Sequence, residues 1–358
     1  MGLSSGTTSS GSSELTVTPL DASSVQAWRQ YVLAHPMGTP FHLPAWSSAV
    51  EKAYGHRPSH LGAFSHGRLG GVLPLFEVNS MFVGRVMVSV PYATYGGILA
   101  DSSDDSRALL EHAKALCHQR GARYLELRHR EQSGLNLPVN DRYDTFRGEL
   151  PSQAADVMPN LPRKCRAAAR NGIKALGEDC FDVGPQWLGA IHDLYAFTLR
   201  RLGSPPYRRS LFEALADGFG DDCICAVVRK AGKPIAGVVS FVFRDQIVPY
   251  FSGSLPEATA DCANNVMYAR LMEYAVSKGI KCFDFNRTRR DNDGPHSFKR
   301  NHGFAPTPLH YQMYLAGDQQ MPNLTPSNGK FAMASKVWRK LPLWLTTPAG
   351  GTISKWIP

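Results

Sequence analysis

The sequence lacks the short motifs by which several large enzyme classes bind phosphate, metal or a nucleophile. No P-loop, HExxH or GxGxxG segment is present, and no GxSxG elbow joins an expected strand to a helix. These absences argue against P-loop nucleotide hydrolysis, zinc proteolysis, elbow-type serine hydrolysis and dinucleotide-dependent redox chemistry. The chain also has no run of about 18 apolar residues, so a membrane-spanning helix is not expected.

Cysteine use indicates reduced thiols. The seven cysteines are odd in number and scattered, so a disulfide framework is not expected and a cytoplasmic location fits better. Cys223 and Cys225 lack the second pair of a zinc site, which predicts ordinary strand packing and no metal site. The opening MGLSSGTTSSGSS has neither a basic beginning nor an apolar region, so residues 1–14 are expected to form a flexible leader rather than a signal peptide.

The composition is that of a globular protein with a basic surface. Of the 358 residues, 43% are hydrophobic and only 19% are charged. This length suits two domains of ordinary size. The formal net charge of +9 indicates an anionic partner such as a phosphorylated substrate, a nucleic acid or an acidic membrane face.

The hydrophobic pattern repeats in the two halves of the chain. In each half, meandering strands precede a helix that feeds a strand ending near positive charge, ARYLELRHR in the first half and KCFDFNRTRR in the second. A duplicated mixed α/β fold is the simplest interpretation. We therefore expect domains over 15–150 and 151–318, followed by a basic tail over 319–358.

The tail combines tryptophan with positive charge. It contains five Lys or Arg, no acidic residue and three of the six tryptophans. The tryptophans and leucines of KVWRKLPLWL can form one apolar face, although Pro342 would end a long helix. Two interpretations stay open: a terminal helix that packs on the body, and a foot on the inner face of the membrane through residues 331–358.

The segment LPRKCRAAARNGIKALG carries the strongest charge pattern. On a helix, four of its cations fall within about 80° of one another, with apolar residues on the other side. These four residues, here named the basic stripe, are Arg163, Arg166, Arg170 and Lys174. Such a stripe can hold a polyphosphate or a nucleic-acid backbone, and a solvated amphipathic face is the alternative.

The stretch FDFNRTRRDNDGPHSFKRNHGF places unusual positive charge after a short strand. Alternation puts Phe283 and Phe285 on one sheet face and Asp284 on the other. Arg287 follows at the carboxyl end, where open α/β sheets usually hold ligands. Lys299 lies in SFKRNHGF, which is predicted to turn back against the strand end. A cation there can neutralise the oxyanion of acyl transfer or hold the phosphate of a leaving carrier.

These segments together resemble the FemAB-type transferases. FDFNRTRRDNDGPHSFKRNHGFAPTPLHYQ is similar to that family's C-terminal signature, a DFGRS-like strand followed by a spacer, FK, a basic residue and WG or GF. PYATYGGILAD, FHLPAWSSAVEKAYG, LPRKCRAAARNGIKALG and NNVMYARLMEYAVSKG occur in the same order as in that family. The likeness covers most of the chain and is closest to the branch associated with exopolysaccharide and exosortase systems.

The resemblance implies two tandem GNAT-like domains and transfer of an acyl or aminoacyl group from an activated carrier to an amine. By position, Lys299 matches the family's functional lysine and is expected to be catalytic, and Arg287 matches the arginine of the DFGRS-like motif. Asn286, Thr288 and His302 stand where the family usually has glycine, serine and tryptophan.

The resemblance also indicates which residues bind the reactants. Substrate binding is expected at Arg287, Arg300, Tyr250, Asn264, Asn265, Tyr95, Gly96, Gly97 and Trp46, and carrier binding at the basic stripe. The general base stays open among Asp284, His296 and the substrate itself. No metal or tightly bound cofactor is expected. The acyl donor is a co-substrate, and aminoacyl-tRNA, acyl-CoA and acyl carrier protein all stay open, because the chain lacks both a coiled-coil arm and the usual coenzyme A pyrophosphate loop.

The resulting hypothesis is a cytoplasmic bacterial N-acyl or aminoacyl transferase, acting without a covalent intermediate on an amino group of a cell-envelope or exopolysaccharide precursor. One alternative is a metal-dependent glycosyltransferase that uses Asp291 and Asp293 as a manganese-diphosphate motif. Another is a non-catalytic scaffold that assembles envelope proteins through the tail.

Overall fold

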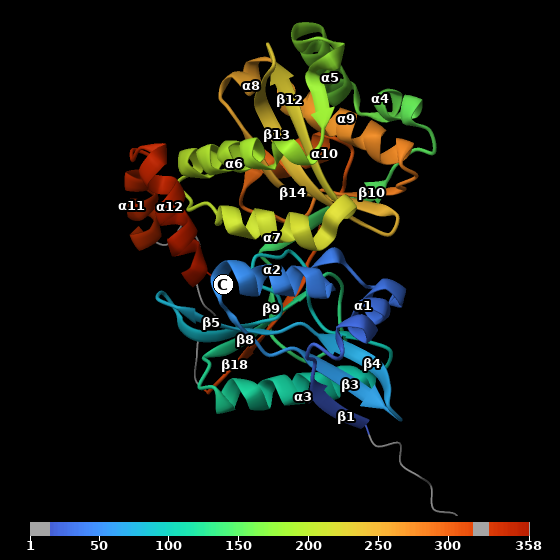
Figure 1. Ribbon diagram of the computed structural model, residues 1–358, viewed down its shortest axis with the longest axis vertical. Helices are drawn as coiled ribbons and strands as arrows, with labels where there is room; N and C mark the ends of the chain where they lie inside the picture. Colours follow the sequence, from blue (N-terminus) through green and yellow to red (C-terminus); the bar gives the residue numbers. More distant parts are fainter. Residues whose placement is uncertain (1–14, 318–328, 358) are drawn as a thin grey trace, which may run out of the picture.

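The computed structural model describes residues 15–317 and 329–357, so the expected leader lies outside the described residues. Two lobes stand one above the other (Figure 1). The strands and helices up to the middle of the chain are β1 (Leu15–Pro19), α1 (Val25–Ala34), η1 (Pro40–His42), α2 (Pro44–Tyr54), β2 (Arg57–Pro58), β3 (Leu61–Ser65), β4 (Arg68–Leu73), β5 (Phe76–Ser80), β6 (Gly84–Val88), β7 (Leu99–Ala100), α3 (Ser103–Gln119), β8 (Tyr124–His129), β9 (Val139–Asn140) and β10 (Tyr143–Glu149).

The remaining elements follow in the second half of the chain. They are η2 (Ala154–Asp156), α4 (Val157–Asn160), α5 (Arg163–Leu176), η3 (Glu178–Cys180), β11 (Phe181–Val183), η4 (Pro185–Trp187), α6 (Leu188–Leu202), α7 (Arg209–Phe219), η5 (Gly220–Asp222), β12 (Cys223–Lys230), β13 (Lys233–Phe243), β14 (Gln246–Ser254), α8 (Glu257–Ala260), α9 (Ala263–Ser277), β15 (Cys282–Asp284), β16 (Thr288–Arg289), α10 (Asp293–Asn301), β17 (Pro306–Pro308), β18 (His310–Leu315), α11 (Gly329–Trp338), α12 (Leu343–Ile353) and η6 (Ser354–Trp356).

The same unit of strand, crossover helix and parallel strand occurs in both lobes. In the lower lobe α3 joins β6 to β8, and in the upper lobe α9 joins β14 to β15. Each parallel ladder is short. The upper one pairs Gln246 with Cys282 and Ile247 with Phe283, and no further ladder pair joins the two strands. The mixed α/β pattern and its duplication are therefore present in the structure.

A division of the chain at residues 150 and 318 would assign two strands to the wrong lobe. β10 pairs antiparallel with β15, β16 and β17 in the upper lobe. β18 returns to the lower lobe and pairs with β8 and β9. The sequence pattern identifies a strand but not its partner, because pairing is set by contacts far apart in the chain. The domain bounds themselves stay a prediction.

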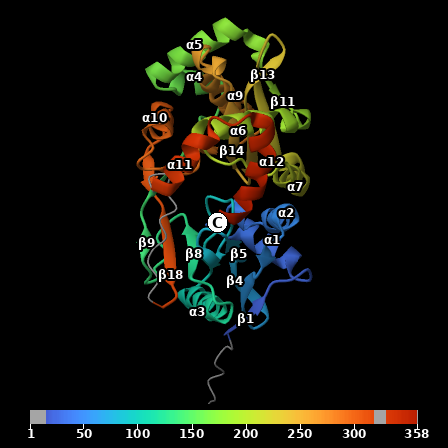
Figure 2. The ribbon, with the colours of Figure 1, turned by 90° about the vertical axis from the view of Figure 1, so that its left-hand side faces the viewer.

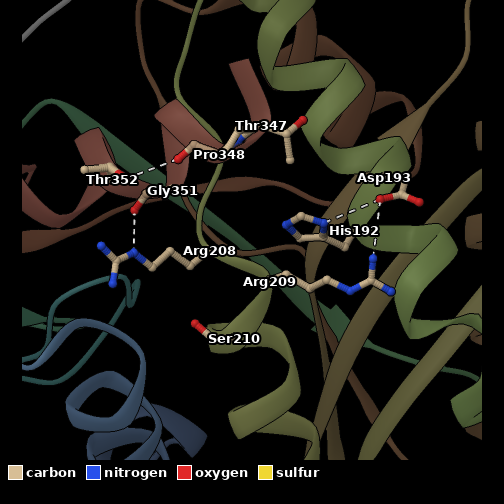
Figure 3. Close-up of a pocket in the computed structure, with 9 residues that line it drawn as sticks. All are labelled: His192, Asp193, Arg208, Arg209, Ser210, Thr347, Pro348, Gly351 and Thr352. Carbon is tan, nitrogen blue, oxygen red and sulfur yellow. Dashed lines mark hydrogen bonds and ion pairs between the residues drawn. The ribbon is translucent and has the colours of Figure 1, made fainter. Parts of the chain in front are cut away.

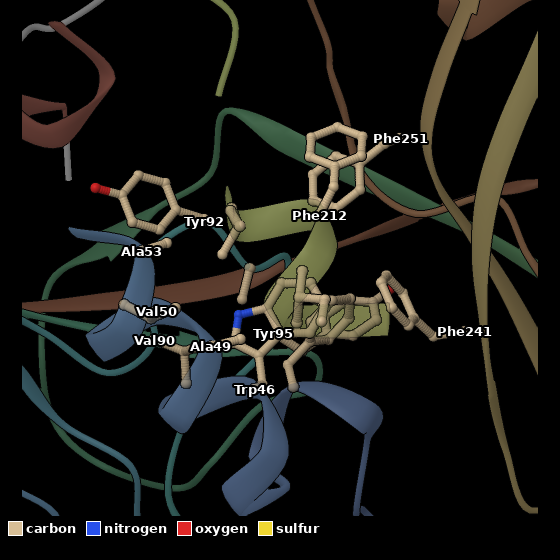
Figure 4. Packing of buried hydrophobic residues seen from close by; sticks show 14 of the residues in the cluster. Trp46, Ala49, Val50, Ala53, Val90, Tyr92, Tyr95, Phe212, Phe241 and Phe251 are labelled. Carbon is tan, nitrogen blue, oxygen red and sulfur yellow. The ribbon is translucent and has the colours of Figure 1, made fainter. Parts of the chain in front are cut away.

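An aromatic core joins the two lobes. Helix α2 of the lower lobe packs on α7 of the upper lobe, and Trp46 is fully buried between them. Its indole packs edge-on against Phe241, with the ring centroids 5.3 Å apart (Figure 4). It also packs edge-on against Tyr250, at 5.2 Å. Buried aromatic rings contribute large apolar area, so this cluster fixes how the lobes meet.

Gly253 permits the close approach of α6 to β14. A Cβ at this position would lie 2.2 Å from the carbonyl carbon of Leu194. We expect Gly253→Ala to lower the free energy of unfolding by about 1–3 kcal/mol, because the backbone of α6 must move away from the sheet. Gly218→Ala is the control, since its Cβ would meet Ala45 at an ordinary 3.4 Å. Equal chemical-denaturation midpoints for the two variants would contradict this reading.

The described part of the tail packs on the body. Thr346 and Ser354 are fully buried, and the Ser354 hydroxyl lies 2.9 Å from that of Tyr54. The Ser80 hydroxyl donates to the carbonyl of Trp356 at 2.6 Å. Pro342 separates α11 from α12, as predicted from its missing N–H. No helix among the described residues is long and apolar enough to span a membrane.

The segment predicted as a turn around Lys299 is instead a helix, α10. It begins after Asn292, and Gly303, with φ +94°, follows its end. Asp293 in the first turn favours a helix start, because an acid there complements the helix dipole. This helix places Lys299 over the end of β15.

Candidate active site

The carboxylate of Asp284 forms the centre of a buried polar group at the end of β15. Asp284 is fully buried, and alternation along the strand turns it away from Phe283 and Phe285, as predicted. It accepts hydrogen bonds from the Tyr95 hydroxyl at 3.1 and 3.2 Å and from the Asn286 N–H at 2.8 Å. Burial raises the pKa of Asp284 above its ordinary value.

The YGG segment of the lower lobe supplies Tyr95 to this group. The Tyr95 hydroxyl also contacts the Thr145 hydroxyl of β10. Gly96 and Gly97 each donate a backbone N–H to the carbonyl of Arg128, at 3.1 and 3.2 Å. A Cβ on Gly97 would lie 2.2 Å from the His129 ring. The glycines therefore let this loop lie flat on β8, which positions Tyr95 rather than presenting the glycines to a ligand.

Asn286 shows why a departure from the family pattern is tolerated. Its φ is +61°, in the left-handed region that glycine and asparagine adopt most readily. The side-chain amide donates to the carbonyl of Pro249 on β14 at 2.7 Å. The side-chain oxygen is buried without a hydrogen-bond partner. Asparagine thus keeps the backbone shape of the usual glycine and adds a bridge between β14 and the end of β15.

Lys299 places an ammonium group at the same strand end. Its Nζ donates to the carbonyls of Asn286 at 2.9 Å and Arg287 at 3.1 Å, and lies 5.2 Å from the centre of the Phe146 ring. Burial lowers the pKa of Lys299 to about 7, with Asp284 acting to raise it and Arg287 to lower it. A lysine poised near neutrality at a strand end is typical of functional sites.

Arg287 lies among tyrosines where the lobes meet. Its guanidinium is 4.7 Å from the centre of the Tyr143 ring and 5.6 Å from that of Tyr311. It donates to the Tyr311 hydroxyl at 3.1 Å. In the part of the chain that the structure describes, the ion pairs at this strand end are made by Arg289 and Arg290, and Arg287 forms none with an acidic side chain. A half-buried cation held by aromatic faces can bind an anionic or carbonyl oxygen.

Helix α5, which carries the basic stripe, lies beside the first turn of α9. Helix α5 packs on α9 through Gly172, where a Cβ would lie 2.5 Å from Val266. Asn265 approaches the Cys165 thiol at 3.7 Å, and Asn264 donates to the Ser254 hydroxyl at 3.4 Å. Both asparagines therefore occupy the N-terminal turn of α9, where helix N–H groups attract anions.

The cations of the stripe lie on the outer side of α5, as predicted. Arg163, Arg170 and Lys174 are exposed and Arg166 is half-buried, whereas Cys165 and Ala169 are buried.

Several predicted residues have other roles. Trp46 is fully buried in the aromatic core, so the expectation that it binds substrate is corrected: its side chain packs between the lobes. Tyr250 is half-buried and donates to the carbonyl of Tyr92 at 2.7 Å. Arg300 is exposed on α10. His296 lies within hydrogen-bond distance of the Asp144 carboxylate, at 3.1 Å, so this ring nitrogen is engaged within the protein.

The proposed manganese motif is engaged within the protein. Arg289 binds the Asp291 carboxylate through two hydrogen bonds. Among the described residues, no group of three or more His, Cys, Asp or Glu side chains is placed to hold a metal. Cys223 and Cys225 lie in β12 as ordinary strand residues.

Sequence reasoning missed three members of the site: Tyr143, Thr145 and Tyr311. Tyr143 and Thr145 lie on β10 and Tyr311 on β18, the two strands whose partners the sequence could not give. The tyrosines near the ends of short strands were the one available signal.

A separate pocket of about 330 Å³ lies at the seam between the tail and the upper lobe (Figure 3). It is lined by His192, Asp193, Arg208, Arg209, Ser210, Thr347, Pro348, Gly351 and Thr352. Arg208 donates to the carbonyl of Gly351 at 2.8 Å and so ties the tail to the body. None of the predicted site residues lines this pocket.

Comparison with known proteins agrees with the geometry. Residues 163–300, which run from α5 to α10, match the family model described as an acetyltransferase (GNAT) domain. FemX has a similar structure, with a TM-score of 0.63 and 15% sequence identity over 84% of this chain and 97% of that one. No curated protein matches the sequence.

Two further solved structures are similar over most of the chain. A tandem GNAT protein from the clavulanic acid biosynthesis pathway gives a TM-score of 0.53 at 13% identity, covering 86% of this chain and 100% of that one. The C-terminal domain of a putative lysylphosphatidylglycerol synthetase from Agrobacterium fabrum gives 0.54 at 13% identity, covering 88% and 95%. The chain therefore shares its fold with FemX and with the tandem GNAT protein, and its residues 163–300 match the acetyltransferase (GNAT) domain model.

Proposed function

We propose that this protein transfers an acyl or aminoacyl group from an activated carrier to an amino group of a cell-envelope precursor, such as an exopolysaccharide unit. The observation that carries the proposal is the position of Lys299. Its ammonium lies at the carboxyl end of β15, held by two backbone carbonyls beside a buried carboxylate. The GNAT domain supports acyl transfer as the reaction type.

The donor would lie between the ends of β14 and β15. The ladder between these strands ends at Ile247 and Phe283, while β14 continues to Ser254. The first turn of α9 follows that end, and no side chain caps this helix. The basic stripe lies on the neighbouring α5. Helix N–H groups and four cations together favour a phosphorylated carrier.

Lys299 would act on the charge that develops at the acyl carbonyl. When the acceptor amine attacks, the carbonyl oxygen becomes negative, the new C–N bond forms, and the carrier leaves with the electron pair. A preorganised cation in a water-poor site stabilises that oxygen strongly. The protonated form of Lys299 is the one that does so. Arg287 and its tyrosines would bind the acceptor on the side where the lobes meet.

Asp284 would be a positioning residue in this scheme. Its carboxylate is occupied by Tyr95 and Asn286, so it is held away from direct proton transfer to substrate. Its negative charge raises the pKa of Lys299. The substrate amine itself, entering neutral, would then lose its proton to solvent or to the leaving carrier.

Loss of the outer cations of the basic stripe is expected to weaken donor binding and to leave the rate of the chemical step unchanged. In Arg163→Gln/Arg170→Gln, KM for the donor should rise about tenfold while kcat stays unchanged, because charge-assisted contacts to phosphate are lost in ground state and transition state alike. Steady-state kinetics at two salt concentrations measures this. An unchanged KM would show that the basic stripe is a solvated face that does not bind the donor.

Donor identity is tested with labelled acyl groups. The full-length protein is incubated separately with aminoacyl-tRNA, acyl-CoA and acyl-loaded carrier protein, each with an amine acceptor, and labelled amide is separated from unused donor. Amide formed from one donor, and lost in Lys299→Ala, supports the proposal. Absence of amide with all three donors, across sugar and peptide amines, contradicts it and favours a non-catalytic scaffold.

A further inference from the structure

Exposed large apolar side chains gather on one side of the molecule. Among the described residues, those more than about one third exposed are Val25, Met81, Phe82, Val139, Leu202, Met333, Val337, Trp344 and Leu345. Four belong to α11 and α12, Leu202 ends α6, and Met81 and Phe82 form the turn between β5 and β6. A monomer exposes such residues singly, so this concentration indicates a contact surface.

Hydrogen bonds place these segments next to one another. Arg339, which follows α11, donates to the carbonyl of Leu202 at 3.1 Å. Ser80, which precedes the turn with Met81, donates to the carbonyl of Trp356 after α12 at 2.6 Å. In Figure 2, α11 and α12 lie side by side toward the viewer, above β5. We name the seven side chains Met81, Phe82, Leu202, Met333, Val337, Trp344 and Leu345 the tail face.

Positive charge accompanies the tail face. Lys336 lies three residues after Met333 and one before Val337, so all three share one exposed side of α11. Arg339 and Lys340 are exposed in the link to α12. The sequence has no acidic residue after Asp318. Trp344 is 77% exposed and stands on the outer side of α12, opposite the buried Thr346 and Gly350.

We propose that the tail face rests on the surface of an anionic phospholipid bilayer. Apolar side chains including tryptophan, flanked by lysine and arginine, match the boundary between headgroups and acyl chains. The helices are tied to the body and none of the described ones spans a membrane, so the contact is peripheral. The charge favours lipid phosphate over a second copy of the chain, whose own tail face carries the same sign. The proposal is independent of the acyl-transfer reaction.

Vesicle sedimentation tests this contact with the full-length protein. Vesicles of phosphatidylglycerol and phosphatidylcholine are compared with vesicles of phosphatidylcholine alone. Binding is expected only to the anionic vesicles. Trp344→Glu should weaken it at least tenfold, and Lys336→Gln/Lys340→Gln about 30-fold, from the usual gain per cation near an anionic surface. Val25→Glu, at an apolar residue exposed on α1 away from the tail face, should bind like the wild type.

Three results would overturn the proposal. One is failure of the wild type to sediment with anionic vesicles at low salt. Another is equal binding by the wild type and by the Trp344 and lysine variants, all with unchanged thermal unfolding. The third is a dimer by light scattering that Trp344→Glu dissociates, which would identify a second copy as the occupant.

Discussion

Lys299→Ala should lower kcat by about 10²- to 10³-fold, because the variant removes the cation that faces the developing oxyanion. Donor KM should change little, since the stripe and the α9 terminus are untouched. Lys281→Ala, an exposed lysine just before β15, is the matched control and should keep full activity. Single-turnover measurement of acyl transfer with the preferred donor separates the chemical step from binding. Full turnover by Lys299→Ala would remove Lys299 from the mechanism.

Lys299 is also expected to lower the free energy of unfolding. Burial lowers the pKa of Lys299 from 10.5 in an unperturbed lysine to about 7. Between pH 7 and 10.5 the unfolded chain holds a proton that the folded chain does not, so the free energy of unfolding rises with pH across this range. Below pH 7 the folded protein carries the buried charge at its full cost. Lys299→Met should therefore stabilise the protein at pH 6, on the order of 2 kcal/mol, while lowering kcat as much as Lys299→Ala does.

Asp284→Asn should change the pH dependence of catalysis. In the wild type, kcat should fall as pH rises through the pKa of Lys299, because only the ammonium stabilises the oxyanion. Removing the Asp284 charge removes the interaction that raises this pKa. The falling limb should therefore move about one unit lower, with kcat reduced about tenfold on its alkaline side. Asparagine keeps an oxygen that accepts the hydrogen bond from Tyr95. The expected shift of the limb is therefore due to the lost charge and not to loss of folding.

The profile of kcat against pH at saturating donor and acceptor measures this shift. Asp182→Asn, on β11 and away from the site, provides a control at a half-buried carboxylate. A limb that rises with pH through 7 would make neutral Lys299 a general base. If the falling limb lies at the same pH in Asp284→Asn as in the wild type, electrostatic coupling between Asp284 and Lys299 is excluded.

Much of the fold follows from local pattern. The helix expected to carry the basic stripe is present as α5, with its apolar side on α9 and its cations outside. The alternation in FDF correctly separates the aromatic face of β15 from Asp284. These features depend on neighbours a few residues apart, and a single sequence carries that information.

The rest depends on contacts between distant segments. Nothing local to β10 or β18 shows that they pair across the lobes, yet this pairing brings Thr145 and Tyr311 to the site. Trp46 was expected to bind substrate because its segment belongs to the shared motif order, but packing between α2 and α7 buries it. Asn286 looked like a disturbance of the motif, whereas its left-handed backbone preserves the shape.

Native mass spectrometry of the purified protein tests the central claim most directly. Wild type and Arg163→Gln/Arg170→Gln would each be titrated with coenzyme A thioesters, acyl carrier protein and charged tRNA. The account predicts a one-to-one complex of the wild type with one donor class, weakened in the stripe variant. Failure to bind any of the three donors, or equal binding of the preferred donor by both proteins, would contradict it.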